Sequence, residues 1–105
     1  MLVTVYVTFP DKKTAVDIAR SLVDERLVAC ANVFAIDSIF RWEGKVQEQP
    51  EFAAFFKTSE ARAYEAMMRI SKLHPYDTPC VERLDAKADE KYSAWICSEV
   101  NGRSV

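Results

Sequence analysis

The chain has 105 residues, of which half are hydrophobic and 29% are charged, and its net charge at pH 7 is −2. This length and composition predict a single globular domain over residues 1–105. The absence of a cluster of Lys and Arg argues against nucleic-acid binding. No apolar run reaches the roughly eighteen residues of a membrane span, and the N-terminus lacks the basic start of a secretory signal. Three widely spaced cysteines, Cys30, Cys80 and Cys97, cannot form a closed disulfide set. We therefore expect a cytoplasmic protein with reduced thiols and with no membrane or nucleic-acid partner.

The N-terminal third is expected to form a strand followed by a helix. Residues 2–9 alternate, with Val and Phe at the odd positions, which predicts a strand with one strongly apolar face. Pro10 ends this strand, and Asp11 is suited to cap a helix that runs to about Arg26. Apolar side chains recur in that helix at three- and four-residue spacing, so it is expected to pack on a sheet.

The central segment, residues 27–58, is expected to form an unusually long β-hairpin. Two β-rich runs flank a polar turn at residues 42–45. The first arm would span about 46 Å at ~3.3 Å per residue, whereas the preceding helix would cover only roughly 23 Å. The return arm contains Pro50, which predicts a bulge or a sheet edge at that point. Another copy of the chain is therefore expected to bury the apolar side chains of the far half, which are Ile39, Phe40, Trp42, Val46 and Phe52.

The C-terminal half repeats the strand and helix order. Residues 52–58 read as an apolar strand covered on both faces, and Thr58 or Ser59 would cap a helix to about Lys72. A turn stiffened by two prolines over residues 74–79 precedes a fourth strand at 80–84. A polar linker at 85–90 then leads to a last helix. The apolar stripes predicted for these two helices are Ala63, Tyr64, Met67, Met68 and Ser71 in the first, and Tyr92, Trp95, Ile96 and Val100 in the second.

The resulting order is strand, helix, strand, strand, helix, strand and a C-terminal helix. This order predicts an α+β, ferredoxin-like fold, in which four antiparallel strands carry two helices on one face. The long hairpin between the second and third strands separates the chain from a plain monomeric example of that fold, and it predicts self-association. The fold alone does not decide the function.

Five motifs in order resemble the CutA family of divalent-cation tolerance proteins. They are A-C-A-N at 29–32, S-I-F-R-W-E-G-K at 38–45, E-F-A-A-F-F-K-T at 51–58, H-P-Y-D-T-P at 74–79 and Y-S-A-W at 92–95. The resemblance implies a homotrimer built by pairing long hairpins, similar in plan to the PII signalling proteins, with no catalytic reaction. It also implies a role in tolerance to copper and other divalent cations. The chain departs from the family pattern at Phe40, where a Tyr is usual, and at Cys80, where a Glu is common.

The candidate metal ligands are His74, Cys80, Asp77 and Cys30. A His and Cys pair suits copper or zinc, and His74 and Cys80 lie six residues apart across the rigid turn. Two other interpretations remain: His74 can hydrogen-bond the turn, and Cys80 can be a small buried hydrophobe. No zinc-type motif is present within one chain, so a metal site would be shared between copies of the same residues at an interface.

A second set of residues is expected to line a cleft between subunits. Lys57, Glu51 and Trp42 form either a salt-bridge lock for the trimer or a small-ligand pocket, and the sequence does not separate these interpretations. Aromatic side chains with polar atoms would wall the same cleft. The full predicted cleft set is Ser38, Trp42, Glu51, Lys57, Tyr76, Tyr92 and Trp95.

The sequence thus predicts a non-enzymatic homotrimer that takes part in copper and other divalent-cation tolerance by direct metal binding. No cofactor is required, and copper or another divalent cation would be the ligand. The alternatives are a PII-like trimer that binds a small metabolite or a protein at its subunit cleft, and a scaffold for a partner protein.

Overall fold

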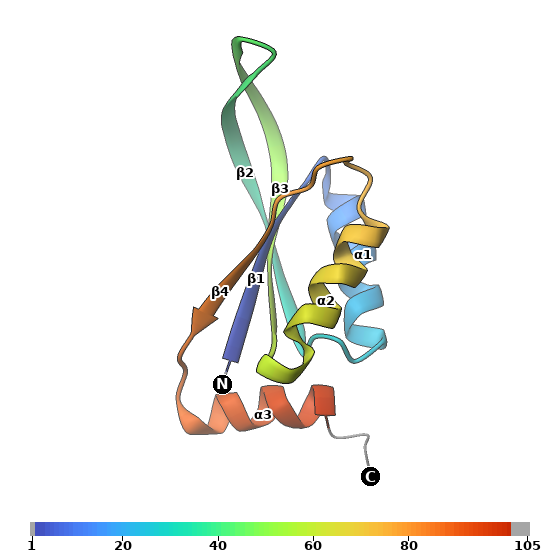
Figure 1. Cartoon of the computed structure of the whole chain (residues 1–105), viewed down its shortest axis with the longest axis vertical. Helices are drawn as coiled ribbons and strands as arrows, with labels where there is room; N and C mark the ends of the chain where they lie inside the picture. The colour runs from blue at the N-terminus through green and yellow to red at the C-terminus, as the bar shows by residue number, and fades with distance from the viewer. Residues whose placement is uncertain (1, 102–105) are drawn as a thin grey trace.

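The computed structural model describes residues 2–101, which form one four-stranded antiparallel sheet and three helices (Figure 1). The strand order is β2-β3-β1-β4. Helices α1 and α2 lie side by side on one face of the sheet, and α3 crosses the end of the sheet away from the hairpin tip. The predicted α+β topology is therefore confirmed. The elements are β1 (Leu2–Phe9), α1 (Lys12–Asp24), β2 (Cys30–Trp42), β3 (Lys45–Ser59), α2 (Glu60–Leu73), β4 (Val81–Ala86) and α3 (Glu90–Asn101).

The main core lies between the sheet and the two helices on its inner face. The alternation predicted for β1 holds, because Val3, Val5, Val7 and Phe9 are all fully buried. The register pairs Val5 with Phe56, so β3 buries its even-numbered side chains on the same face. The odd-numbered side chains of β3 therefore point to the opposite face, which we call the outer face.

Both predicted helix starts are confirmed. The Asp11 carboxylate accepts a hydrogen bond from the Thr14 amide at 2.8 Å, and the Ser59 hydroxyl accepts one from the Arg62 amide at 3.3 Å. Each cap satisfies one of the free amides at the first turn of its helix. These two cap residues therefore mark where α1 and α2 begin.

The apolar stripe predicted for α2 is largely wrong. Tyr64 and Met68 are 75% and 54% exposed, whereas Ala66 and Ile70 are buried together with the correctly predicted Ala63. Met67, which was also predicted, packs partly buried against the core, whereas Tyr64 and Met68 point away from it. In α3, Ile96 and Val100 are buried as expected, and Trp95 is exposed.

The hairpin of β2 and β3 extends well beyond the helices (Figure 1). The register runs unbroken from Cys30↔Lys57 to Trp42↔Lys45 and passes Asp37↔Pro50, so the predicted bulge is wrong. Pairing of β3 with β1 ends at Phe52, so Pro50 lies where β3 has only one neighbouring strand, as the edge alternative predicted.

The far half of the hairpin exposes large apolar side chains, as predicted. Ile39, Trp42 and Val46 are 67%, 62% and 61% exposed. Phe52 is an exception, because it packs partly buried against the main core. An exposed apolar β-ribbon of this size is a strong candidate for an interface with another molecule.

The turn of the hairpin gives a direct test of backbone strain. Glu43 and Gly44 have φ values of 51° and 80°, which is the geometry of a type I′ turn. A Cβ atom at Gly44 would meet no atom within 4 Å, so only the left-handed backbone opposes a larger residue. Gly44→Ala should therefore lower the free energy of unfolding by about 1–2 kcal/mol in urea denaturation. Gly44→Asn should recover most of that loss, and an equal loss in both variants would contradict the explanation.

Candidate functional site

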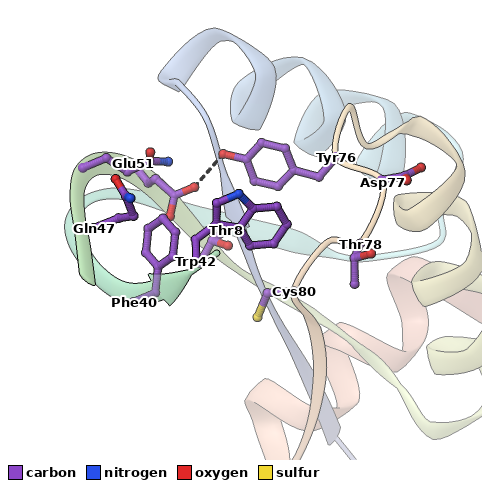
Figure 2. Close-up of a pocket in the computed structure, with 10 residues that line it drawn as sticks. Thr8, Phe40, Trp42, Gln47, Glu51, Tyr76, Asp77, Thr78 and Cys80 are labelled. Carbon is purple, nitrogen blue, oxygen red and sulfur yellow. Dashed lines mark hydrogen bonds between the residues drawn. The ribbon is translucent and has the colours of Figure 1, made fainter. Parts of the chain in front are cut away.

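A cavity of about 770 Å³ lies between the outer face of the hairpin and the segment that joins α2 to β4 (Figure 2). Strands β2 and β3 supply one wall, β1 supplies Thr8, and residues 76–80 supply the other wall. The alternation of β2 and β3 explains why these side chains share a face. The lining residues are Thr8, Phe40, Trp42, Gln47, Gln49, Glu51, Tyr76, Asp77, Thr78 and Cys80.

Glu51 is the most deeply placed charged group of this cavity. Its side chain is 7% exposed, and both carboxylate oxygens accept hydrogen bonds from hydroxyl groups. Ser38 Oγ donates to Oε1 at 2.6 Å, and the Tyr76 hydroxyl donates to Oε2 at 2.6 Å (Figure 2). These two bonds hold the carboxylate at a fixed position and join the hairpin to the segment after α2.

His74 holds the backbone of Tyr76 in place by a hydrogen bond. Its Nε2 lies 2.7 Å from the Thr8 carbonyl oxygen, so Nε2 carries the proton and Nδ1 accepts the Tyr76 amide proton at 3.1 Å. The buried imidazole stacks on Phe9, with ring centroids 5.0 Å apart and an interplanar angle of 12°. Both ring nitrogens are therefore engaged by the protein, in agreement with the interpretation in which His74 bonds the turn.

The four predicted metal ligands do not come together in one chain. Cys80 and Asp77 line the cavity, His74 lies behind it with both nitrogens engaged, and Cys30 lies at the other end of β2. Cys30 Sγ is 3.5 Å from the Tyr92 hydroxyl. Over residues 2–101 no three His, Cys, Asp or Glu side chains gather closely enough to hold a metal ion. Two of the predicted ligands thus share a site, and the other two have different roles.

The environment of Cys80 favours the thiol over the thiolate. Burial raises the pKa of Cys80, and the negative charges of Glu82 and Glu51 raise it further. A soft metal ion would therefore have to displace a proton that the cavity retains.

The predicted cleft set divides into two groups. Ser38, Trp42, Glu51 and Tyr76 meet at the cavity or beside it. In the second group, Lys57 Nζ lies 5.5 Å from the centre of the Tyr92 ring, which packs on Trp95 with centroids 5.9 Å apart. Lys57 and Glu51 share a face of β3, but six residues of strand place them roughly 20 Å apart. The two charges therefore form no salt bridge within one chain, and a lock between subunits remains a prediction.

Several lining residues were not predicted, namely Thr8, Gln47, Gln49 and Thr78. Strand alternation could have found the two glutamines, because they share a face with Glu51 and pair with Phe40 and Ser38. No comparable signal in the sequence indicates Thr8, which is distant along the chain.

The Tyr76 phenol offers a pH test of this geometry. Burial, and then the hydrogen bond to and the charge of Glu51, raise the pKa of Tyr76 to about 12. Because this pKa exceeds the unfolded value of 10.0, the resulting stability is present below pH 10 and is lost between pH 10 and 12. The difference in phenolate absorbance between the parent chain and Tyr76→Phe should show a midpoint near 12. A midpoint near 10 would contradict the bond to Glu51.

Comparisons with known proteins decide the family. The model of the CutA1 divalent ion tolerance protein family matches residues 3–99. The chain belongs to this family. A Pyrococcus horikoshii divalent-cation tolerance protein CutA is 40% identical over 99 residues, which are 93% of this chain and 97% of the relative. The Thermotoga maritima protein of that name is 38% identical over 94% of this chain and 99% of the relative.

Solved structures of CutA proteins share the fold. The Archaeoglobus fulgidus structure matches with a TM-score of 0.92 at 33% identity, covering 96% of this chain and all of that one. A Pyrococcus horikoshii CutA1 structure matches with a TM-score of 0.90 at 39% identity, covering 94% of this chain and 98% of that one. The long hairpin is thus part of the CutA fold.

Membership of the CutA1 family confirms two of the predictions. The family is one of divalent-cation tolerance proteins and is non-enzymatic, as the resemblance implied. The Archaeoglobus fulgidus protein is described as periplasmic and an Arabidopsis thaliana relative as chloroplastic, so a cytoplasmic location remains a prediction for this chain. Over residues 2–101, no helix combines the length and the apolar character needed to span a bilayer.

Proposed function

We propose that this chain acts in divalent-cation tolerance as a homotrimer that binds metal directly, copper first, at the Cys80 end of the cavity. The observation that carries the proposal is the placement of Cys80 and Asp77 in one cavity with the fixed carboxylate of Glu51. A thiolate suits Cu(I), and adjacent carboxylates suit harder divalent ions. Because one chain supplies too few close ligands, a neighbouring subunit would complete the set, as symmetry allows at an interface.

The exposed hairpin supports the homotrimer. Its far half presents Ile39, Trp42 and Val46 to solvent, and β2 is a 13-residue strand at the sheet edge. Such an edge pairs readily with another chain. The CutA relationship favours another copy of this chain as the partner, in a ring of three subunits.

A calorimetric titration tests metal binding. Reduced protein, with its mass measured by light scattering, is titrated with Cu(I) and with Zn(II). Saturation at a whole-number ratio per trimer is expected, with affinity rising with pH because the Cys80 proton is displaced. Cys80→Ser should weaken Cu(I) binding at least tenfold, and Cys97→Ser, which removes a half-buried thiol on α3, should not. Equal binding by the parent chain and Cys80→Ser would refute the site.

The second candidate function is small-molecule binding in the same cavity, as in a PII-like signalling trimer. The observation that favours it is the volume of about 770 Å³ with aromatic walls, which is in the range of small-molecule sites. A bound ligand would raise the melting temperature by mass action, and a thermal-shift screen would detect it.

A further inference from the structure

We propose that the cavity over Glu51 binds a small organic cation, an alkylammonium or guanidinium group attached to an apolar body. This inference rests on the second candidate function and names the chemical class of its ligand. It is carried by the charge of the cavity, by the bonding of Glu51 and by the aromatic walls.

The cavity has a one-sided charge. Its lining contains Glu51 and Asp77 but no Lys, Arg or His. Burial and then the charge of Glu82 raise the pKa of Cys80, which lines the cavity. A cavity of this sign attracts cations and repels anionic metabolites.

Glu51 has hydrogen bonds but no cationic partner. Within residues 2–101, no Lys, Arg or His nitrogen lies within 4.0 Å of its carboxylate. Its two bonds come from the neutral hydroxyls of Ser38 and Tyr76, and a carboxylate has about four acceptor positions. A buried carboxylate is costly unless its charge is compensated, so a cationic ligand would supply the missing charge and use the free acceptor positions.

The walls suit an organic cation better than a hydrated metal ion. Tyr76 contacts the carboxylate through its hydroxyl, and Phe40 and Trp42 line the same cavity further towards the hairpin tip (Figure 2). Aromatic faces attract ammonium and guanidinium groups, and tryptophan does so most strongly. The amide side chains of Gln47 and Gln49 add further acceptors along β3.

A matched set of probes tests the ligand class. Reduced protein with a chelator present is titrated by calorimetry with phenethylamine, 2-phenylethanol and 3-phenylpropionate, which are cationic, neutral and anionic relatives. The amine should bind about tenfold or more tightly than the alcohol, which corresponds to about 1.4 kcal/mol. The acid should not bind. Phenethylguanidine, which has the same apolar body and no amine, should show that a guanidinium group is also accepted.

Variants locate the binding. Glu51→Gln removes the charge with little change in shape, and it should weaken amine binding about tenfold or more. Glu48→Gln makes the same change on β3 but on the opposite face, next to Ile39, and should have no effect. If Glu51→Gln does not fold, Phe40→Leu in the cavity wall replaces it and should weaken amine binding several-fold.

The outcomes separate the ligand class from the second candidate function. Binding of only the alcohol or the acid, or equal binding of all three probes, overturns the cationic class but keeps a small-molecule site. Binding of none of the probes by an intact oligomer overturns both. Metal uptake through Cys80 is measured separately and without chelator, so its result does not depend on either outcome.

Discussion

Replacing Ile39, Trp42 and Val46 together by threonine is expected to convert the proposed trimer into a monomer of 12.0 kDa. These side chains are more than half exposed in the single chain, and threonine keeps the strand preference of the hairpin. Burying each of them in an interface contributes about 1.5–3 kcal/mol, so the variant loses up to roughly 4.5–9 kcal/mol per chain. Light scattering and sedimentation would measure the change in mass.

A matched control distinguishes an interface from general loss of apolar surface. Tyr64→Thr with Met68→Thr removes two similarly exposed side chains from the outward face of α2, and this variant should keep the parent mass. If the hairpin variant keeps the parent mass, or if the α2 variant also dissociates, the hairpin is not the interface.

Phe9→Ala is expected to lower the free energy of unfolding by about 3–5 kcal/mol, which is a large part of the 5–15 kcal/mol typical of a domain. Phe9 is fully buried, packs near Phe56 with ring centroids 6.3 Å apart, and stacks on His74. Because His74 holds the backbone of Tyr76, the same change should loosen the bond between Tyr76 and Glu51. The pKa of Tyr76, which is about 12 in the parent chain, should therefore fall towards 10.

Urea denaturation would measure the loss of stability, and phenolate absorbance would measure the change at Tyr76. Tyr64→Ala removes an aromatic ring that is exposed on α2 and should change stability by less than about 0.5 kcal/mol. A loss below about 1 kcal/mol for Phe9→Ala would contradict its place in the core. An unchanged phenol midpoint would show that the position of Tyr76 does not depend on the stack.

Local patterns in the sequence were sufficient for most of the fold. The alternation of β1, the cap at Asp11 and the turn before Lys45 each act over a few residues, and the structure confirms all three. The length of the hairpin relative to α1 also correctly indicated which apolar side chains lack cover, apart from Phe52.

The remaining features depend on contacts between distant segments. The buried side of α2 carries Ala63, Ala66 and Ile70, whereas the predicted stripe included the exposed Tyr64. The role of His74 depends on a carbonyl group at Thr8, 66 positions away, and on a ring at Phe9. Strand alternation placed Glu51 and Lys57 on one face, but only their separation along β3 shows that they belong to different groups.

The order of the strands in the sheet has a consequence for synthesis of the chain. β1 precedes both of its partners along the chain, yet it lies in the middle of the sheet, paired with β3 up to Ser59 and with β4 up to Ala86. Its two partners are made later, so the apolar segment Leu2–Phe9 has no partner strand until β3 has been made. Long-range strand pairing of this kind is slow compared with helix formation. The sheet can close only after β4 has been made, and a nascent chain that stops before Ala86 would be a natural client for a ribosome-bound chaperone.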